Sequence, residues 1–436
     1  NVPLEAVISV SEPEGGYTVE DTIEFCKLAD GLIDIIHLRS GEMDPQHPLG
    51  FTSTEAMPTP YLEEMGQVCR AVHQLGLNMV VGASAGFQDP DWANRAVAEG
   101  KADLIYMARA WINNPDYGQK VFEGRAEDIV PCIRCNKCHV SNGKDMWRSV
   151  CSVNPELGFQ DKLERMVPPV GRPQKVAVVG GGPAGLEFAR IAAQRGHNVT
   201  LAEQTDKLGG LLKFTDYDDL KVDLMWLKNY LIRQVEKHNV NVLLNTTVTP
   251  EFIRDGGYDA VILAVGSSPA RPPIPGLDDP AVEHATTVYT KLDQVGKRVA
   301  VLGGGLVGCE TGLFLAERGH QVTIIEMQSE IAPEANWMHK EGMMQAFAKA
   351  PITARTGLRV SRLEPGKGVY AVNGEGAEEF IPADTIVYAM GMRPNTQTVE
   401  ALRDACLDTV CVGDCVRARK ARQAMEEGYW AAVNLA

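Results

Sequence analysis

The sequence predicts an α/β protein made of three kinds of segment: four βα units, a cysteine-rich stretch and two glycine-rich βαβ units. Short apolar strands alternate with amphipathic helices over residues 1–130. Closely spaced cysteines then run from Cys132 to Cys151, and a Gly-x-Gly-x-x-Gly turn occurs twice further on, after Lys175 and after Arg298. Strands that alternate with helices are typical of parallel sheets.

Composition limits the class of protein. The 436 residues suffice for several domains, and 44% hydrophobic with 23% charged residues is typical of globular proteins. No apolar run reaches the ~18 residues of a membrane span, and no secretory leader is seen. A formal charge of -15 argues against nucleic acid or an anionic membrane as a partner. We therefore expect a cytoplasmic protein that binds small molecules; a homo-oligomer is compatible with this composition.

The first segment predicts half of an eight-stranded βα barrel. An open half barrel would expose two sheet edges and an unfilled core, so we expect an N-terminal half of roughly 200 residues to be absent from this sequence. Strands are expected at residues 4–9, 32–38, 78–82 and 102–107, with helices at 18–28, 61–75 and 90–99.

The cysteine pattern predicts a metal centre. Four of the ten cysteines lie in Cys132-Ile-Arg-Cys135-Asn-Lys-Cys138 and, further on, Cys151. A secreted protein held together by disulfides would be shorter, and its cysteines would be spread more evenly along the chain. Zinc also binds four cysteines, but it more often uses two separated Cys-x2-Cys pairs. The tight Cys-x2-Cys-x2-Cys run favours a [4Fe–4S] cluster, and it indicates a reducing compartment.

The first glycine-rich turn has the full context of a dinucleotide site. A strand at residues 175–179 leads into Gly180, Gly182 and Gly185, and a helix runs on to residue 195. A second strand, 199–202, ends in Glu203. The glycines allow the tight turn, the approach to a pyrophosphate and close helix packing, while the acid accepts a ribose hydroxyl.

The second turn repeats the first. A strand at 298–302 precedes Gly303, Gly305 and Gly308, and a strand at 322–325 ends in Glu326. Two such units predict two bound dinucleotides. Glu326 would repel a 2′-phosphate and Met327-Gln328-Ser329 offers no arginine, so we expect NADH rather than NADPH.

Two further motifs resemble those that close the FAD site in flavoprotein reductases with two dinucleotides. They imply FAD in the first unit and NAD(H) in an inserted second unit. No paired dithiol follows Gly209-Gly210, and we interpret Cys406 and Cys411 as core residues, so electrons must leave FAD by another route. The predicted FAD residues are Ala264 and Gly266 in the first closing motif and Gly413 and Asp414 in the second. Gly210, which follows Gly209, is a further predicted FAD residue.

These segments give a domain plan of five parts. They are a partial barrel at 1–130, a cluster segment with linker at 131–170, an FAD domain in two parts at 171–296 and 391–436, and an NAD(H) domain at 297–390.

The order of half barrel, cysteine segment and two nucleotide units resembles the large Old Yellow Enzyme relatives, among them 2,4-dienoyl-CoA reductase, 2-enoate reductase and trimethylamine dehydrogenase. The resemblance implies FMN at the carboxyl end of the barrel strands, with its phosphate held by Ala85, Gly86, Ala108 and Arg109. It also implies a main proton donor in the absent half. After the second strand the dienoyl-CoA reductases place a catalytic histidine; His47 is the nearest match, although its register is off and a surface loop histidine is the alternative.

The resemblance also implies a reaction. NADH reduces FAD, the cluster relays single electrons to FMN, and FMN reduces an α,β-unsaturated carbonyl substrate such as an enoate, enoyl thioester or enone. Two alternatives stay open. One is an amine dehydrogenase that delivers electrons to a separate flavoprotein, and the other is an electron-input module for a partner subunit.

Overall fold

The computed structural model describes residues 2–12, 15–39, 54, 59–84, 86–139, 149–159 and 161–435. The chain divides into two compact units, which are described separately: unit 1 is Asn1–Leu157 with Asn336–Gly342, and unit 2 is Gly158–Ala335 with Met343–Ala436. In the ranges given above, no helix combines the length and the apolar character needed to cross a membrane.

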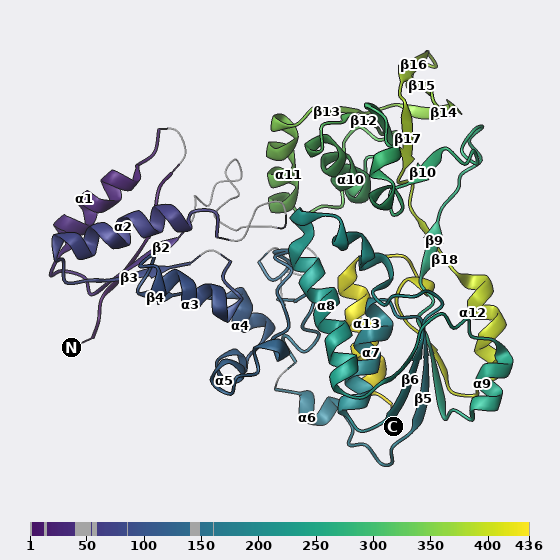
Figure 1. The fold of residues 1–436 in the computed structure, drawn as a ribbon, viewed down its shortest axis with the longest axis horizontal. Coiled ribbons are helices and arrows are strands. Elements are labelled where there is room, and N and C mark those ends of the chain that lie inside the picture. The colour runs from purple at the N-terminus through teal and green to yellow at the C-terminus, as the bar shows by residue number, and fades with distance from the viewer. Residues whose placement is uncertain are drawn as a thin grey trace. The chain divides into compact units, whose positions relative to one another are not determined.

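Unit 1 contains a four-stranded parallel sheet in the order β1-β2-β3-β4, which confirms the prediction of four adjacent parallel strands. Helices α1, α2 and α3 follow the first three strands (Figure 1). The last strand is shorter than the predicted 102–107, because only two of its residues complete the ladder to β3. The bounds are β1 Glu5–Ser9, α1 Val19–Ala29, β2 Ile35–Arg39, α2 Leu62–Leu75, β3 Val80–Ala83, α3 Pro90–Ala98 and β4 Leu104–Ile105.

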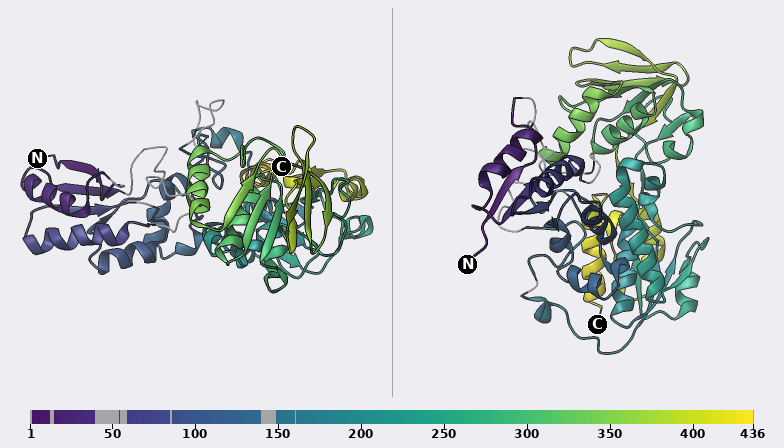
Figure 2. Two further views of the ribbon diagram at one scale, coloured as in Figure 1. Left: turned by 90° about the horizontal axis from the view of Figure 1, so that it is seen from above. Right: turned by 60° about the vertical axis from the view of Figure 1, so that its left-hand side comes forward.

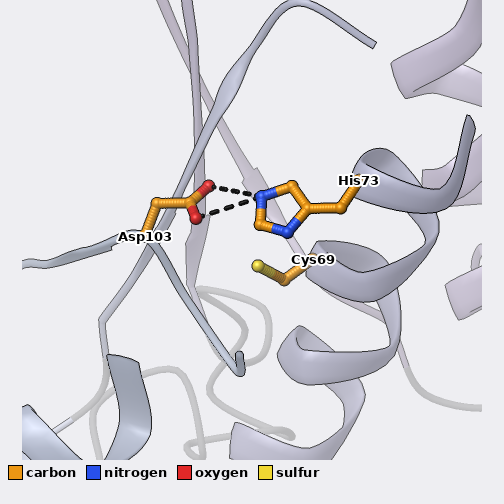
Figure 3. Close-up of side chains that lie close together, drawn as sticks. All are labelled: Cys69, His73 and Asp103. Atoms are coloured by element: carbon orange, nitrogen blue, oxygen red, sulfur yellow. Dashed lines mark hydrogen bonds and ion pairs between the residues drawn. The ribbon is translucent and has the colours of Figure 1, made fainter. Parts of the chain in front are cut away.

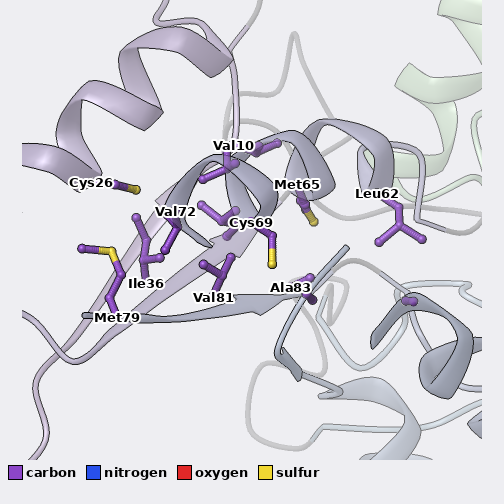
Figure 4. Packing of buried hydrophobic residues seen from close by; sticks show 14 of the residues in the cluster. Val10, Cys26, Ile36, Leu62, Met65, Cys69, Val72, Met79, Val81 and Ala83 are labelled. Carbon is purple, nitrogen blue, oxygen red and sulfur yellow. The ribbon is translucent and has the colours of Figure 1, made fainter. Parts of the chain in front are cut away.

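The core of unit 1 lies between one face of this sheet and its helices (Figure 4). Ile36 and Val81 point from β2 and β3 toward Val72 of α2, and all three are fully buried. Alternate residues of a strand point to opposite faces of the sheet, so every second side chain of each strand points into this core.

The other face of the same sheet carries apolar side chains that are exposed. Val7, Val80 and Leu104 are 56%, 42% and 39% exposed, and they come from β1, β3 and β4. Isolated exposed apolar residues are ordinary, but a row of them across neighbouring strands marks a surface that needs a cover.

After β4 the chain forms short helices and then the cysteine segment. Asp116 is the N-cap residue of α5, and Arg125 is that of the 3₁₀ helix that follows. Neither side chain makes a capping hydrogen bond. The bounds are α4 Arg109–Asn113, α5 Tyr117–Phe122 and η2 Ala126–Asp128.

Unit 2 contains two parallel sheets with the same spatial order. The first runs β19-β8-β5-β6-β7 and the second β10-β17-β11-β12-β13, so the order 8-5-6-7 in one matches 17-11-12-13 in the other. The strands of the first sheet are β5 Lys175–Val179, β6 Asn198–Ala202, β7 Asn241–Leu243, β8 Ala260–Leu263 and β19 Thr409–Cys411. Those of the second are β10 Val282–His284, β11 Arg298–Leu302, β12 Gln321–Ile325, β13 Ile352–Arg355 and β17 Thr385–Tyr388.

The second sheet is inserted in the chain between β8 and β19, as predicted. The two connecting segments pair with each other as the antiparallel strands β9, Ser267–Pro269, and β18, Met392–Pro394. An antiparallel sheet that the sequence did not reveal lies at one end of this region (Figures 1 and 2). It consists of β14 Arg359–Glu364, β15 Gly368–Val372 and β16 Glu378–Pro382.

Helices of unit 2 pack beside these sheets. Gly428 of α13 lies so close to α7 that a Cβ there would be 2.4 Å from the Ala184 carbonyl oxygen. The α-helices of unit 2 are α6 Leu163–Met166, α7 Pro183–Gln194, α8 Val222–Lys237, α9 Pro250–Gly256, α10 Leu306–Glu317, α12 Thr396–Leu402 and α13 Ala421–Val433. Helix α11, Trp337–Lys349, begins in a segment of unit 1 and ends in unit 2. The 3₁₀ helices are η3 Gly210–Asp216, η4 Asp219–Lys221, η5 Val288–Thr290, η6 Leu292–Gln294, η7 Arg403–Ala405 and η8 Gly413–Cys415.

Candidate cofactor sites

The first glycine turn lies between β5 and α7 and requires glycine at two positions. Gly180 has φ +108°, and a Cβ there would be 2.4 Å from the carbonyl oxygen of Ala264. A Cβ on Gly185 would be 2.0 Å from the Gly180 carbonyl oxygen. Gly182 differs, since its nearest neighbour would be the Gly210 Cα at 3.8 Å. The turn is therefore closed toward the protein and open at Gly182, as a site for a pyrophosphate requires.

Glu203, the residue after β6, holds this turn. The residue is 7% exposed, and its Oε2 accepts from the Gly181 backbone N–H at 2.9 Å. Its Oε1 accepts from the backbone N–H and the hydroxyl of Thr205 at 2.9 and 2.7 Å. The acid predicted to face a ribose thus lies against the glycine turn.

The second turn, between β11 and α10, repeats this geometry. Gly303 has φ +102°, and a Cβ there would be 2.6 Å from the Ala389 carbonyl oxygen. A Cβ on Gly308 would be 1.9 Å from the Gly303 carbonyl oxygen. Gly305 is the N-cap of α10 and would meet only the Oε1 of Glu334, at 3.4 Å.

Glu326 occupies in the second turn the place of Glu203 in the first. It is 8% exposed, and its Oε2 accepts from the Gly304 N–H at 2.6 Å while its Oε1 accepts from the Gln328 N–H at 2.7 Å. The two acids come from equivalent strands of two sheets with equal order. This repetition supports two dinucleotide sites built in the same way.

Glu334 is a residue that the sequence did not single out. Its exposed side chain lies at the start of α10, where Oε1 accepts from the Leu306 backbone N–H at 2.6 Å. Helix N-termini bind phosphate through such N–H groups. An anion bound at this turn would therefore have to displace the Glu334 carboxylate.

The closing motifs of the first unit converge on its glycine turn. Gly210 has φ +55°, and a Cβ there would be 2.8 Å from the Gly182 Cα. Gly413 has φ +74°, and a Cβ there would be 2.9 Å from the Ala184 Cβ, at the start of α7. Both glycines bring backbone to the mouth of the turn, where side chains would block a ligand.

Asp414 lies beside the second closing segment. Its Oδ2 accepts from the Ser267 hydroxyl at 3.2 Å, and its Oδ1 accepts from the Arg419 backbone N–H at 3.1 Å. Burial raises the pKa of this carboxyl group. Ser267 follows Gly266, which has φ +66°, so the predicted residues of both closing motifs meet here.

A half-buried ion pair also joins the two nucleotide-binding regions of unit 2. Lys221 of η4 is 5% exposed, and its Nζ lies 2.6 Å from Oε1 of Glu310 on α10. Neither residue was singled out by the sequence, because the pairing spans two segments with no shared motif.

The cysteine segment belongs to unit 1, and its cysteines are free thiols. Arg134 and Asn136 have φ +44° and +53°, so the chain coils at two points between Cys132 and Cys138. Side chains other than glycine rarely adopt this conformation, which indicates that the coil is held by its surroundings.

The four thiols act on one another. Burial raises the pKa of Cys132 and of Cys151 to about 12, and in each case the charge of Cys135 raises it further. Burial likewise raises the pKa of Cys138, and the charge of Cys135 adds to it. Thiols close enough to raise one another's pKa hold their protons tightly unless a cation balances the thiolate charge, so this donor set fits a four-thiolate metal centre.

Amide side chains fix this segment to the rest of unit 1. Gln88 accepts from the Cys132 N–H at 2.6 Å and donates to the Cys132 carbonyl oxygen at 2.9 Å. Asn114 makes the same two-way contact with the backbone of Val130, at 2.8 Å in each direction. Asn113 also donates to the Val130 carbonyl oxygen. No sequence signal marked these three residues, because amide clamps have no fixed spacing.

Of the four predicted FMN residues, the structure describes Gly86, Ala108 and Arg109. Gly86 has φ +96°, and Ala108 is exposed directly before α4. The guanidinium Nη1 of Arg109 donates to the Asn136 Oδ1 at 2.6 Å, so this side chain contacts the cysteine segment. Ala85 and His47, the predicted catalytic residue, lie outside the described residues.

A further group of possible ligands lies on α2 and before β4 (Figure 3). His73 Nε2 is 3.1 Å from Asp103 Oδ1, and Asp103 Oδ2 accepts from the Val81 N–H at 2.9 Å. Burial raises the pKa of Cys69 to about 11, and the charge of Asp103 adds to this. His73 lies in the last turn of α2, and its contact with Asp103 accounts for this group without a metal.

Comparison with known proteins agrees with the repeated turns. Residues 156–257 and 253–419, more than half of the chain, match the model of the pyridine nucleotide-disulphide oxidoreductase family. The chain belongs to this family. Its second unit therefore carries the dinucleotide-binding fold that both glycine turns predicted.

Relatives extend the likeness over unit 1. The NADH oxidase of Thermoanaerobacter brockii is 34% identical over 95% of this chain, and the match spans 64% of that protein. A solved structure of 2-naphthoyl-CoA reductase with 2-naphthoyl-CoA superposes with TM-score 0.90 at 29% identity, covering 98% of this chain and 64% of that chain. Histamine dehydrogenase from Rhizobium sp. 4-9, at 22% identity and TM-score 0.83 over 100% of this chain and 66% of that chain, shares the fold.

These matches confirm the predicted fold class and the resemblance to large Old Yellow Enzyme-like flavin oxidoreductases. The chain spans about two thirds of the length of the proteins that it matches, so the activity of a whole enzyme is a matter for proposal.

Proposed function

We propose that this chain is part of a cytoplasmic, NADH-dependent flavoprotein reductase that acts on an α,β-unsaturated carbonyl compound. NADH would reduce FAD, and electrons would pass singly through a [4Fe–4S] cluster to FMN at the barrel strands. The names of two relatives, an NADH oxidase and a 2-naphthoyl-CoA reductase, support the electron donor and the class of substrate.

One observation carries the proposal. The cysteine segment is clamped by Gln88, Asn113 and Asn114 to the loops at the carboxyl ends of β3 and β4. Active sites of βα barrels lie at this end of the strands. A cluster held there is in the right place to exchange electrons with a flavin bound by the same loops.

The residues of unit 2 have separate tasks in this proposal. Gly182 and Gly305 leave space for two pyrophosphates at the starts of α7 and α10. Glu203 and Glu326 present carboxylates beside the two ribose positions. Asp414, anchored by Ser267, would accept hydroxyls of the ribityl chain of FAD.

Loss of one cysteine tests the electron path. We expect Cys151→Ala to lose cluster absorbance and substrate turnover, while reduction of FAD by NADH in a stopped-flow experiment keeps most of its rate. Anaerobic metal analysis should find iron and acid-labile sulfide in the unmodified protein. Zinc without iron would refute the cluster.

Cys406→Ala is the matched control. Cys406 is also a free cysteine, and it packs in the core beneath β8 and β19 with Cys411. It should keep cluster absorbance and turnover. If it abolished turnover while Cys151→Ala did not, the electrons would leave FAD through a dithiol instead.

The amine dehydrogenase alternative predicts the opposite direction of electron flow. It would be supported if amines reduced the flavins while NADH did not. The complete second turn, with Gly303, Gly308 and Glu326 in the same geometry as the first, favours NADH as a substrate.

A further inference from the structure

The side chain of Glu334 lies over the start of α10, where the second glycine turn leaves space for a ligand. Its Oε1 accepts from the Leu306 backbone N–H at 2.6 Å. A Cβ added to Gly305 would lie 3.4 Å from the same oxygen. A backbone N–H at the start of a helix is the group that binds a phosphate oxygen. The carboxylate of this chain thus fills the place that a dinucleotide phosphate would take.

The segment before Glu334 is fixed to the glycine turn. Ala332 donates its backbone N–H to the Gly304 carbonyl oxygen at 2.7 Å, and both Ile331 and Ala332 are buried. Ala332 has φ +44°, a left-handed conformation that alanine rarely adopts. Such a conformation persists only where the surroundings impose it. The chain therefore turns two residues before Glu334 and brings it to the start of α10.

The backbone and the side chain of Glu334 are held differently. Lys420, which precedes α13, donates from its Nζ to the Glu334 backbone carbonyl oxygen at 2.9 Å. The residue is exposed, and its carboxylate has solvent beside it. Exposed side chains change rotamer within nanoseconds. The carboxylate can therefore rotate away from α10 while the backbone contact stays in place.

A dinucleotide and this carboxylate compete for one position. The pyrophosphate is an anion, as is the Glu334 side chain, and a helix N-terminus favours a single negative group near its N–H groups. Glu326 already places a second carboxylate at the neighbouring Gly304 N–H. Two anions and a pyrophosphate at one turn would repel one another.

We propose that Glu334 is an internal competitor of NADH: its carboxylate closes the phosphate position at α10 in the empty protein and rotates away when the dinucleotide binds. The inference rests on the proposed function, since it concerns the regulation of the proposed NAD(H) site. The apparent Kd rises in inverse proportion to the fraction of protein in which the position is open. NADH and NAD⁺ carry the same pyrophosphate, so Glu334 weakens the binding of both and opposes retention of the oxidised product.

The test measures the binding of ADP-ribose to the FAD-containing protein by isothermal titration calorimetry. ADP-ribose carries the adenosine and the pyrophosphate of NADH but no nicotinamide, so the result does not depend on electron transfer. Glu334→Ala should lower the Kd about tenfold, as expected if about nine tenths of the unmodified protein hold the contact. Glu334→Gln keeps an acceptor oxygen but loses the charge, and it should lower the Kd less.

The same contact predicts an opposite effect on the empty protein. The carboxylate satisfies an N–H group at a helix start, so its loss in Glu334→Ala should lower the Tm measured without nucleotide. A residue that only repelled the nucleotide from a distance would leave this Tm unchanged or raise it. A lower Tm together with a lower Kd supports displacement, and a lower Kd with an unchanged Tm would overturn it.

Glu375→Ala controls for the loss of charge. It removes the same charge from the same region of unit 2, but Glu375 lies in the exposed turn between β15 and β16. Its Kd for ADP-ribose and its Tm should equal those of the unmodified protein. A Kd that stays unchanged in both Glu334 variants would overturn the inference.

Binding by the unmodified protein separates this inference from the proposed function. If no variant binds ADP-ribose, the second turn is not a dinucleotide site and both fail. If all variants bind it with one Kd, only the inference fails. Should Glu334→Ala not fold, Glu334→Gln decides: a lower Kd supports the inference, and an unchanged one refutes it.

Discussion

At the scale of single residues, the acid of the second dinucleotide turn determines which nucleotide we expect to bind there. Glu326 lies at the turn with Met327 beside it, 67% exposed, where an NADPH site would need a cation. The carboxylate oxygens already accept from Gly304 and Gln328, so the acid is fixed in place. A fixed anion near the ribose repels a 2′-phosphate.

We therefore expect a preference for NADH that depends on Glu326. Glu326→Ala should reduce the ratio of kcat/KM for NADH to that for NADPH by about tenfold, or about 1.4 kcal/mol. A dye-reduction assay with both nucleotides measures it. Glu375→Ala, in an exposed turn, removes the same charge and should leave the ratio unchanged. A protein that prefers NADPH would contradict the expectation.

His284, at the end of β10, predicts a response to acid. It is 6% exposed, its ring lies 4.7 Å from that of Tyr388, and its Nδ1 is 2.8 Å from the Thr286 hydroxyl. Burial, aided by the charge of Arg271, lowers its pKa to about 4. An unfolded histidine has a pKa of about 6.5.

Between those two pKa values the unfolded chain binds a proton that the folded chain does not. Stability is therefore highest above about pH 6.5 and falls as pH drops toward 4, by roughly 2 kcal/mol at pH 5. His284→Gln should make the decline of Tm between pH 7 and pH 5 shallower. An equal decline in both proteins would show that His284 is protonated in the folded state.

At the scale of elements, each glycine turn contains some glycines that the fold requires and another that leaves space for a ligand. A Cβ on Gly308 would overlap the carbonyl oxygen of Gly303, whereas a Cβ on Gly305 would meet only Oε1 of Glu334, at 3.4 Å. The same sequence motif thus contains one glycine that the fold needs and one that a ligand needs.

Two alanine variants test this division. Gly308→Ala should lower stability by at least about 2 kcal/mol, seen as a lower Tm, because its Cβ would be 1.9 Å from an oxygen atom. Gly305→Ala should keep the Tm but raise the KM for NADH about tenfold, since a methyl group would obstruct the pyrophosphate. Equal effects of both variants on Tm would contradict this.

The sequence predicted the elements unevenly, for physical reasons. The strands Lys175–Val179 and Arg298–Leu302 have the predicted bounds, because buried apolar runs end at glycines that cannot continue them. In unit 1, β2 begins at Ile35 rather than at residue 32, since pairing with β1 and β3 and not hydrophobicity sets its ends. The sheet β14–β16 was missed because its two outer strands, β14 and β16, each bury only one residue and so give little hydrophobic signal.

The candidate sites were predicted to the extent that local motifs define them. Glycine turns and cysteine spacing are local, so their residues were found. The clamps of Gln88 and Asn114, the pair Lys221–Glu310 and the contact of Arg109 with Asn136 join distant segments. No spacing in the sequence marks such pairs.

At the scale of the whole molecule, the exposed face of the sheet in unit 1 is the feature that most needs explanation. On it, His37 stacks against Tyr106 with ring centres 3.8 Å apart, and its Nδ1 lies 3.1 Å from Glu5 Oε1. Val7 and Val80 share this face and are exposed. Apolar surface left in water costs roughly 25 cal/mol for each Å².

We expect additional parallel strands to cover this face and complete a barrel. The native protein should then have an intact mass well above the 47.4 kDa of this sequence and release FMN together with FAD on denaturation. Mass spectrometry and flavin chromatography measure both. A protein near 47.4 kDa that releases FAD alone would favour the electron-input module.

The amide clamps around the cysteine coil bear on how a cysteine variant is to be interpreted. Gln88, Asn113 and Asn114 hold the backbone of Val130 and Cys132 through amide groups and not through thiols. Replacement of one cysteine therefore leaves these backbone hydrogen bonds in place, and its effect is a change of donor atoms and not a loss of the loop.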